Sequence, residues 1–517
     1  MLPDCKRSVG IAKRLQDRFA GLDMRPGAAE GSLSHAVNLT SEHYPLLASR
    51  TRRRILKTLT APQGMTAADG LICAAGGVLY DGETSVCALS GGEKTLLEMG
   101  RTVLVFPDKL CYDRVSGTVT HLESRFSGTG LCFEDGTIYG ESAEGNTIRA
   151  VGVAWSTYFK PGDAVTIRCC TVSENNKTAV IREIDGDELH FSEHCFAEAA
   201  ESGTVYIERT LPEMDVLCVH DNRLYGAKDD TVYASALGDP TNFNRFDGTG
   251  TDSFAASTGT PGRFTGAIAF LGCPVFFKET AIFKLYGDRP ENYELLRTVA
   301  PGVRADSAKS LAVTGELCCY LGREGVYAYR GGVPRRISAP LGEALLHAGI
   351  GGSDGRHYYL NALDGSSAAH CFVYDTEQGI WQREDGARTL CYADSPDGLC
   401  GLLADGTLYC RGGSAGTEES CLYWQADFTS EGACTRHRRL IRLVLHIELS
   451  QSGTAEILAS FDGGSYTSLA TLGAGKHIRI IPLPLHRAEH ISLRLCGTGE
   501  MKLYGLERQY AEGSERA

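Results

Sequence analysis

The sequence has little proline and lacks any long apolar segment. Its 517 residues include 17 prolines against 61 glycines. Because the glycines follow no three-residue period, a collagen-like chain is excluded. The longest apolar stretch, residues 266–277, is interrupted by Gly272 and Pro274 and is far short of a membrane span. No apolar core of signal-peptide length follows the basic residues near the N-terminus. We therefore expect no membrane segment and no secretory leader.

Positive charge is also in short supply. The chain carries 51 lysines and arginines against 64 aspartates and glutamates, a formal net charge of −13 at pH 7. Phosphate backbones are bound by positively charged surfaces, so a chain this acidic is a poor general binder of nucleic acid. We expect no specific nucleic-acid binding.

The 19 cysteines lack the pattern of a disulfide framework or a metal site. Their number is odd, they are spread from Cys5 to Cys496, and none forms a Cys-x-x-Cys pair. In strands, the two members of each vicinal pair, 169–170 and 318–319, would point to opposite faces. A disulfide scaffold is the alternative, but we favour reduced thiols in a cytosol that serve as small apolar residues.

Motifs that carry chemistry are missing as well. There is no Gly-x-Ser-x-Gly nucleophile elbow, no phosphate-binding loop and no His-x-x-x-His or His-Glu-x-x-His spacing. The scattered histidines that lack such spacing are His35, His43, His220, His347, His357 and His370. With 64 acidic residues, no particular carboxylate pair of a glycosidase can be nominated. We predict no catalytic, cofactor-binding or metal-binding residues, no cofactor, and a protein that is not an enzyme.

Three polar motifs have a structural and a functional interpretation. Ser460–Ser465 resembles the Asp-box turn of sialidase propellers, but it occurs once and we favour a plain hairpin turn. Asp239 and the loop 247–253, with Asp247 and Asp252, offer oxygens suited to calcium, and a solvated loop is favoured. A basic run would contact nucleic acid or a partner, whereas we favour a solvated strand face or inter-subunit salt bridges. This run consists of Arg50, Arg52, Arg53, Arg54 and Lys57.

What the sequence does contain is a recurring β pattern. An aliphatic residue followed by tyrosine comes repeatedly just after a turn signal such as Asp-Gly, as expected of β-hairpins. In Leu399–Tyr409, two apolar strands flank the turn Ala404–Thr407. Helical periodicity is nearly absent, with exceptions at Ile11–Phe19 and Leu341–His347. The fold class is therefore mostly β.

The hairpins recur about every 30 to 60 residues, which is typical of β-propeller blades. The uneven spacing and the missing Gly-His…Trp-Asp signature exclude a regular WD40 array. We predict an irregular propeller of six or seven blades in residues 61–124 and 211–415, preceded by an N-terminal segment (1–60) that leads into it. The candidate units are 71–88, 94–123, 215–246, 264–296, 307–338, 351–385 and 390–413.

Two further β modules accompany the predicted propeller. Several short strands in residues 125–210, among them Thr178–Ile184 and Glu188–Phe191, predict a small β-barrel inserted into a propeller loop. The alternation of apolar and polar residues over Ile441–Leu449 is typical of a half-buried antiparallel strand. Residues 421–517 are therefore predicted to form a C-terminal β-sandwich.

Several stretches are distinctive enough to be compared with those of a known family. The most specific block is 221–279, with Asp221–Gly226, Val232–Ser235, Leu237–Phe243 and Phe276–Glu279. A second motif is Asn38-Leu39-Thr40-Ser41, followed by Tyr44-Pro45-Leu46 and by Arg50 and Arg53. Weaker matches include Gly325-Val326-Tyr327, Tyr374-Asp375-Thr376 with Trp381, and Gly497-Thr498-Gly499 with Leu503-Tyr504.

These stretches resemble tail proteins of bacteriophages and prophages from Gram-positive hosts. The resemblance implies a β-propeller protein of the tail-nozzle or tail-stabilisation type. Such a protein would be a structural virion component, assembled in the host cytoplasm with other tail proteins and as a homo-oligomeric ring. The alternative is an adsorption protein of the tail that binds a host receptor or cell-wall glycan through residues 421–517, with Trp381, Trp424, Tyr466 and Tyr504 as stacking residues. A propeller glycosidase is the third class of function considered.

Overall fold

The structure, a computed structural model, describes residues 11–28, 31–135, 146–192, 196–246, 248–411, 417–418, 422–429, 431–432, 436–483 and 488–515. The described chain divides into two compact units. The first comprises residues 1–62, 69–71 and 309–517, and the second comprises residues 63–68 and 72–308.

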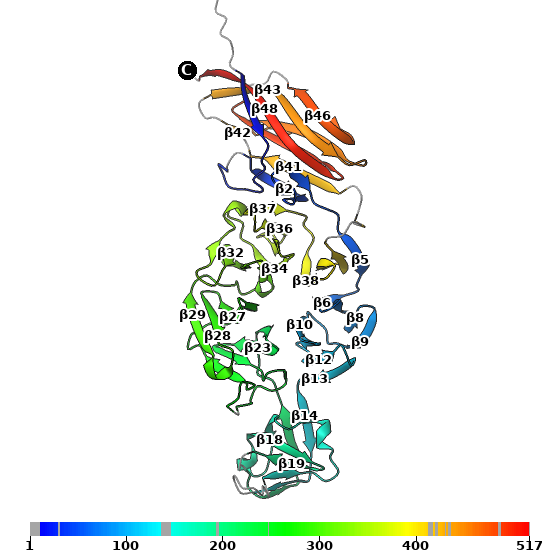
Figure 1. The fold of residues 1–517 in the computed structure, drawn as a ribbon, viewed down its shortest axis with the longest axis vertical. Coiled ribbons are helices and arrows are strands. Elements are labelled where there is room, and N and C mark those ends of the chain that lie inside the picture. Colours follow the sequence, from blue (N-terminus) through cyan, green and yellow to red (C-terminus); the bar gives the residue numbers. More distant parts are fainter. Residues whose placement is uncertain are drawn as a thin grey trace, which may run out of the picture. The chain divides into compact units, whose positions relative to one another are not determined.

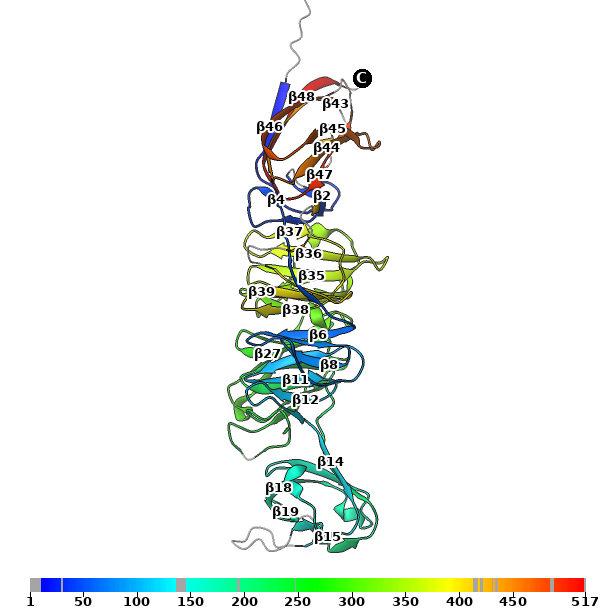
Figure 2. The same cartoon turned by 90° about the vertical axis from the view of Figure 1, so that its right-hand side faces the viewer.

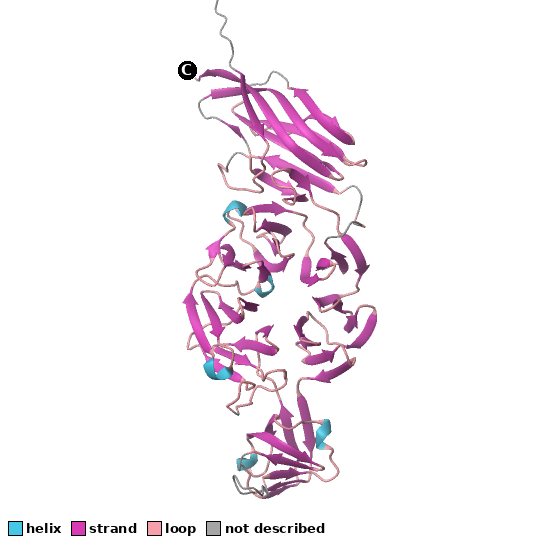
Figure 3. Cartoon of the chain, viewed as in Figure 1, coloured by secondary structure: helices cyan, strands magenta, loops and turns pink. Residues whose placement is uncertain are grey.

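The described chain is built almost entirely of antiparallel strands, so the predicted mostly-β fold class is correct (Figure 3). Its helical turns are short 3-10 segments, and it contains no α-helix among the described residues. These segments are η1 (Trp155–Thr157), η2 (Ser173–Asn175), η3 (Pro290–Asn292), η4 (Ala308–Ser310) and η5 (Ala339–Leu341).

Seven four-stranded antiparallel sheets follow one another along the chain (Figure 1). Their orders are β6-β7-β8-β9, β10-β11-β12-β13, β22-β23-β24-β25, β26-β27-β28-β29, β30-β31-β32-β33, β34-β35-β36-β37 and β38-β39-β40-β5. The strands are β5 (Arg54–Thr58), β6 (Pro62–Ala67), β7 (Leu71–Ala75), β8 (Val78–Asp81), β9 (Thr84–Ala88), β10 (Thr95–Met99), β11 (Thr102–Phe106), β12 (Leu110–Asp113), β13 (Thr118–His121), β22 (Val216–His220), β23 (Arg223–Lys228), β24 (Thr231–Ala234), β25 (Phe254–Ser257), β26 (Gly266–Phe270), β27 (Cys273–Lys278), β28 (Ala281–Tyr286), β29 (Glu294–Val299), β30 (Ala312–Thr314), β31 (Leu317–Gly322), β32 (Gly325–Tyr329), β33 (Arg335–Arg336), β34 (His347–Ser353), β35 (His357–Leu363), β36 (Ala369–Asp375), β37 (Ile380–Arg383), β38 (Thr389–Ser395), β39 (Gly398–Leu403) and β40 (Thr407–Cys410).

Burial within these sheets explains the sequence pattern. Inner strands such as β27 and β31 are buried along their whole length, so they are continuous apolar runs rather than alternating ones. Outer strands such as β13 and β29 are largely exposed. The last sheet takes its fourth strand, β5, from the N-terminal part of the chain, with Thr58 opposite Thr407 and Arg54 opposite Cys410.

Between β13 and β22 lies an eight-stranded insert, Ser124–Arg209, which we call the insert (Figure 2). Its strand order is β14-β21-β17-β18-β19-β16-β15-β20, around an apolar core of its own that contains Trp155. The predicted strand Glu188–Phe191 is confirmed as β19. The strands are β14 (Ser124–Gly128), β15 (Leu131–Glu134), β16 (Thr147–Arg149), β17 (Ala164–Arg168), β18 (Thr178–Asp185), β19 (Glu188–Phe191), β20 (Ala199–Glu201) and β21 (Val205–Arg209).

Two six-stranded sheets, the terminal sheets, combine strands from both ends of the chain (Figure 1). In one, β48 pairs with β1, β4 and β43, β3 pairs with β4, and β46 pairs with β43; the other has the order β2-β41-β47-β44-β45, with β42 on β47. The predicted alternating strand 441–449 is part of β43. The strands are β1 (Ile11–Gln16), β2 (Leu33–Val37), β3 (Leu39–Thr40), β4 (Leu47–Ser49), β41 (Tyr423–Phe428), β42 (Glu431–Gly432), β43 (Arg436–Leu449), β44 (Thr454–Phe461), β45 (Thr467–Leu472), β46 (Gly475–Pro482), β47 (His490–Thr498) and β48 (Met501–Glu515).

Of the two helical segments expected from the sequence, the first is wrong and the second is a single helical turn that lies earlier in the chain. The helical periodicity at Ile11–Phe19 is not a helix, because Ile11–Gln16 pairs residue by residue with β48. Tertiary pairing here overrides a local pattern of only nine residues. In Leu341–His347, a 3-10 turn ends at Leu341 and β34 begins at His347.

Among the described residues, 13 cysteines are free, and two depart from the expectation of reduced thiols. Cys400 and Cys410, which lie opposite each other on β39 and β40, form a disulfide. Seven of the free thiols are buried, among them the vicinal pair Cys318 and Cys319, where they pack as small apolar residues. Sequence spacing could not indicate the Cys400–Cys410 pair, because strand register brings the two residues together.

Candidate functional site

A polar cavity of about 520 Å³ lies in the first compact unit. One wall is the N-terminal segment that leads from the terminal sheets to β5, through residues 39–42 and 50–53. The other walls come from β35, β36, β37 and β39, and from Arg411, which follows β40. Charged side chains from segments more than 300 residues apart therefore converge here.

The N-terminal segment is fixed in place by Asn38 and Arg50. Asn38 has a left-handed backbone (φ 52°), a conformation that asparagine tolerates better than most residues. Its side-chain amide donates to the Tyr423 carbonyl at 2.8 Å and accepts from Arg50 Nε at 2.8 Å. The Arg50 backbone N–H also donates to the Asn38 carbonyl. The guanidinium of Arg50 is thereby aimed into the cavity wall.

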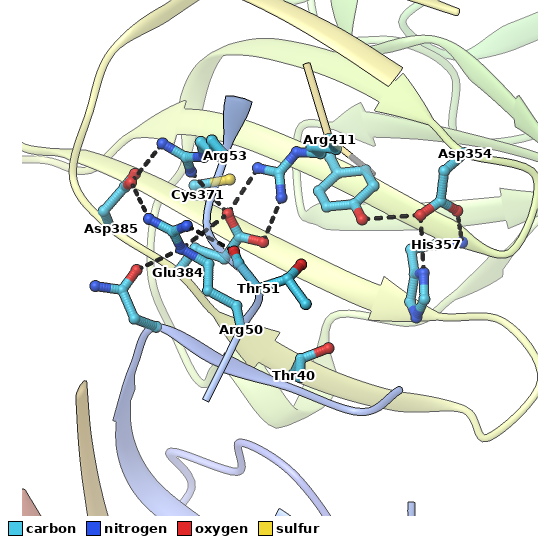
Figure 4. A network of polar contacts seen from close by, with 12 residues as sticks. Thr40, Arg50, Thr51, Arg53, Asp354, His357, Cys371, Glu384, Asp385 and Arg411 are labelled. Carbon is cyan, nitrogen blue, oxygen red and sulfur yellow. Dashed lines mark hydrogen bonds and ion pairs between the residues drawn. The ribbon is translucent and has the colours of Figure 1, made fainter. Parts of the chain in front are cut away.

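Glu384, directly after β37, is the centre of the charged wall (Figure 4). It accepts from Arg411 Nη1 and Nη2 at 2.6 Å each and from Arg53 Nη2 at 2.7 Å. Burial by itself would raise the pKa of Glu384, but the positive charges of Arg411 and Arg53 outweigh it and hold the pKa well below its ordinary value. Glu384 is therefore a buried carboxylate at neutral pH.

Two further carboxylates balance the remaining arginine charge. Arg53 Nη1 lies 2.6 Å from Asp385, and Arg50 donates to both oxygens of Glu418 at 2.7 and 2.8 Å. We call these residues the arginine cluster: Arg50, Arg53, Arg411, Glu384, Asp385 and Glu418. With three positive and three negative groups, the cluster is neutral, as a stable buried ionic network must be.

Aromatic rings complete the cluster. The Arg53 guanidinium lies over the Tyr409 ring at 4.6 Å, and that of Arg411 lies over the Tyr359 ring at 4.1 Å. Such cation–π contacts favour arginine, whose planar group can stack and pair at the same time.

On the opposite side of the cavity, His357 lies between two aspartates. Its Nδ1 is 3.0 Å from Asp354 and its Nε2 is 3.6 Å from Asp375. Burial lowers the pKa of His357, but hydrogen bonds to Asp354 and Asp375 outweigh it and raise the pKa to about 9. Asp375 also accepts from Ser41 Oγ at 2.7 Å and from Arg356 at 2.8 Å, so it joins β36 to the N-terminal segment.

The two aspartates beside His357 favour the ionised form. Despite burial, hydrogen bonds from His357 lower the pKa of Asp354 to about 2 and that of Asp375 below its ordinary range. Among the described residues, no group of three or more His, Cys, Asp or Glu side chains could hold a metal ion.

The structure revises the interpretation of the basic run. Arg50 and Arg53 do not form a solvated strand face or inter-subunit salt bridges; they are buried and pair within the chain. Arg54, on β5, lies 3.1 Å from the exposed Asp397. The carboxylates that pair with Arg50 and Arg53 lie far away in the sequence, so no local sequence motif could indicate these ion pairs.

The other two polar motifs are turns. Asp462 accepts from the backbone N–H groups of Glu489 and His490 at 2.8 Å each, and it follows directly on β44. The oxygens of Asp252 are taken by Gly248 and Thr249 of its own loop. Asp247 lies outside the described residues.

The side chain of Asp239 has different partners from that of Asp252. It pairs with Lys160 of the insert at 2.7 Å and accepts from Thr241. The carboxylate oxygens of Asp239 and Asp252, which were considered as calcium ligands, therefore bind other groups of the described chain.

The four aromatic residues proposed for stacking on sugars differ in exposure. Trp381 and Trp424 are fully buried. The ring of Tyr466 is covered by Arg494 at 4.1 Å, and that of Tyr504 stacks on His446 at 4.7 Å. The two tryptophan rings are therefore inaccessible, and each of the two tyrosine rings has a covered face.

The residues that build the cavity were largely missed by sequence reasoning. Glu384, Glu418 and Asp354 belong to no motif, and His357 was noted only for lacking zinc-site spacing. One signal was present: Arg50 and Arg53 belong to the motif Asn38…Arg53 that carries the resemblance to tail proteins.

Comparison with known proteins gives no family for this chain. No protein family and no curated protein matches it. Among solved structures, an exo-beta-1,3-galactanase from Phanerochaete chrysosporium matches 55% of this chain and 93% of its own, with 10% identity and a TM-score of 0.21. A prolyl endopeptidase matches 67% of this chain and 54% of its own (10% identity, TM-score 0.28), and a glycoside hydrolase matches 56% and 83% (14% identity, TM-score 0.18).

These matches correct one prediction. The sequence analysis expected a protein that is not an enzyme, whereas glycoside hydrolases are among the solved structures that match the chain. That expectation is therefore withdrawn. At these TM-scores and identities, the matches transfer no active site and no substrate to this chain.

Among the described residues, no helix is long and apolar enough to cross a membrane.

Proposed function

We propose that the chain is a structural component of a bacteriophage tail. In this proposal, the seven four-stranded sheets are blades of an irregular β-propeller, the insert is a small β-barrel and the terminal sheets are a β-sandwich. The protein is assembled in the host cytoplasm into the virion tail, next to other tail proteins and as a ring of identical subunits.

The observation that carries the proposal is the role of the residues that resemble tail proteins: they fasten distant segments together. Arg223 is buried and donates to the carbonyls of Ser235, Gly250 and Asp252. One side chain thus holds the whole connection between β24 and β25 in place. A rigid scaffold requires such cross-links within its long connections.

The neighbouring residues of the same block act in the same way. Asn242 donates to the Gly162 carbonyl of the insert at 2.6 Å. Lys278 donates to the carbonyls of Asp229 and Thr260 and lies over the Phe264 ring at 4.5 Å. The second motif, Asn38 to Arg53, forms the arginine cluster described above. Both motifs therefore maintain the architecture, which supports a scaffold.

The test is a search for the chain in particles. Phage particles induced from the strain that encodes the chain are purified and examined by mass spectrometry and by electron microscopy with antibody labelling. We expect stoichiometric amounts of the chain, with label on the tail. Particles with complete tails that lack the chain would overturn the proposal.

The alternative, a glycan-binding adsorption protein, receives less support because the four candidate aromatic rings are buried or covered. Retention of the full chain on purified host cell walls, abolished by Tyr466→Ala and Tyr504→Ala, would restore it. The same walls should not retain the chain if it is solely a scaffold.

A further inference from the structure

The terminal sheet that contains β1, β43, β46 and β48 has an outer face on which apolar side chains stand where polar ones are usual. Its inner side chains, such as Leu443, Leu445 and Ile447, are buried in the core. Strand pairing places Leu15, Glu507, Val444 and Ile480 in one row across the other face. We call this surface the outer face; its described members include Ile11, Lys13, Leu15, Arg442, Val444, Glu448, Lys476, Ile478, Ile480, Lys502 and Glu507.

Large aliphatic side chains are exposed on this face. Ile11 and Leu15 of β1 are 60% and 64% exposed, and Ile478 and Ile480 of β46 are 72% and 58% exposed. The solvent side of an antiparallel sheet normally carries polar residues. Grouped exposed aliphatic residues with polar neighbours mark an interaction surface.

Both outer strands of this part of the sheet are also available for contact. In the described chain, β46 pairs with β43 alone and β1 pairs with β48 alone. Proteins normally protect such edges with charges, bulges or a covering segment. The edge strand β46 carries the charged residues Lys476 and Arg479, and between and beside them it also presents the exposed Ile478 and Ile480.

The charge of the outer face indicates which kind of partner can bind there. Among the outer-face members whose side chains the structure describes, Lys13, Arg442, Lys476 and Lys502 are basic and Glu448 and Glu507 are acidic, which gives these members a net charge of +2. Two copies that met through this same face would bring like charges together, which disfavours a two-fold symmetric contact. The occupant must be acidic and carry some apolar surface.

The insert of a second copy has these properties. Residues 124–209 contain 14 acidic and 7 basic residues, a net charge of −7 and more than half of the −13 of the chain. Four of the acidic residues lie in the hairpin Glu183–Glu188 between β18 and β19. Next to this hairpin, Val151 is 82% exposed, and the N–H of its neighbour Ala150 donates to the Asp187 carbonyl.

We propose that the outer face of one copy binds the acidic hairpin of the insert of the next copy. The aliphatic side chains cover one another, Val151 against Ile478 and Ile480, and the lysines meet the carboxylates of residues 183–188. Such a head-to-tail contact uses two different surfaces and closes into a ring when the rotation permits. This inference rests on the proposed ring-forming scaffold and names the surfaces that join its subunits.

Charge reversal on each surface tests the contact. The face variant carries Lys13→Glu and Lys476→Glu, and the hairpin variant carries Glu183→Lys and Asp185→Lys. A control variant carries Arg263→Glu and Arg388→Glu, two exposed arginines elsewhere. The mass distribution of the full-length chain is measured by mass photometry and analytical ultracentrifugation at low and at physiological salt.

We expect the wild type and the control to self-associate, and each reversed variant to associate about tenfold more weakly or worse. In an equimolar mixture, the native hairpin of the face variant can bind the native face of the hairpin variant. The reversed face and the reversed hairpin are also opposite in charge, so alternating subunits should regain assembly. A third variant, Ile478→Thr with Ile480→Thr, keeps the charges and should also weaken association.

Several results would overturn the contact. These are oligomers unaffected by reversal on either surface, a mixture that stays monomeric, and a wild type that is monomeric at all concentrations. Binding of the wild-type outer face to anionic vesicles without self-association would assign the face to a membrane instead. If the chain is found in tails while the reversed variants assemble normally, the scaffold function stands and only this interface fails.

Discussion

At the scale of single residues, buried charge is the most informative feature of this chain. Glu384 is surrounded by three arginines, and none of them can be deprotonated. Removing one partner of such a network leaves the others buried without a counter-charge, which costs far more than the network contributes. Residues that belong to no motif can therefore dominate the stability of this region.

Glu384→Gln should lower the free energy of unfolding by about 3 kcal/mol, because Arg411 and Arg53 lose their shared carboxylate. Urea unfolding followed by tryptophan fluorescence measures the loss, since Trp381 lies on β37 just before Glu384. The exposed Glu343→Gln, in the same compact unit, is the matched control and should change little. Equal midpoints for the two variants would contradict a structural role of the cluster.

His357 makes the stability of this region fall at alkaline pH. Because its pKa is raised to about 9 from 6.5, the folded chain binds this proton more tightly than the unfolded chain. The stabilisation is fully present below pH 6.5 and is lost as the pH rises through about 9, to a total of about 3 kcal/mol. His357→Asn should flatten the unfolding profile between pH 6 and pH 9.5, and an unchanged slope would refute the ion-pair assignment.

At the scale of elements, the joint between β5 and β40 depends on one glycine. Gly406 has a φ of +93°, and a Cβ atom there would lie 1.9 Å from the Leu59 carbonyl oxygen. Gly82 also has a positive φ, +60°, but no atom lies within 4 Å of its would-be Cβ. A comparison of substitutions at the two positions therefore distinguishes the cost of backbone strain from the cost of a steric clash.

Gly406→Ala should destabilise the chain by about 2 kcal/mol more than Gly82→Ala, since both variants strain the backbone and only the first displaces β5. Hydrogen exchange of residues 54–59 and 407–410 is the direct measurement. Faster exchange in both segments for Gly406→Ala alone is the expected result. Similar protection in the two variants would show that β5 does not depend on this turn.

A second element-scale prediction concerns the connection from β24 to β25. Arg223→Lys keeps the charge but cannot reach all three carbonyl groups, so residues 236–253 should become susceptible to limited proteolysis. The overall free energy of unfolding should fall by only about 1–3 kcal/mol. Exposed Arg263→Lys serves as the control, and equal cleavage rates would contradict the role of Arg223.

At the scale of the whole molecule, local patterns were visible in the sequence and long-range pairings were not. The turn Ala404–Thr407 and the alternation at 441–449 depend on neighbouring residues, so β39, β40 and β43 were predictable. The pairing of β1 with β48 joins the two ends of the chain, and its strand was mistaken for a helix. The cavity was hidden for the same reason, because Arg53 and Glu384 are 331 residues apart.

The insert provides the test of modularity for the whole molecule. Its first and last strands pair with each other, Ser124 opposite Arg209, so both ends of the insert lie side by side. Its core, which includes Trp155 and Phe191, is formed by its own residues. Because the flanking Glu123 already accepts from the Leu211 N–H, a short linker between 123 and 210 should close the gap left by a deletion.

We therefore expect residues 124–209 to fold as an isolated fragment, with cooperative thermal unfolding and dispersed amide resonances. The chain that lacks them should keep the unfolding transition of Trp381 and Trp424, with a moderate loss from the missing Lys160–Asp239 and Asn242–Gly162 contacts. An unfolded fragment, or a deletion that abolishes the remaining transition, would mean that the insert and the adjoining sheets fold only together.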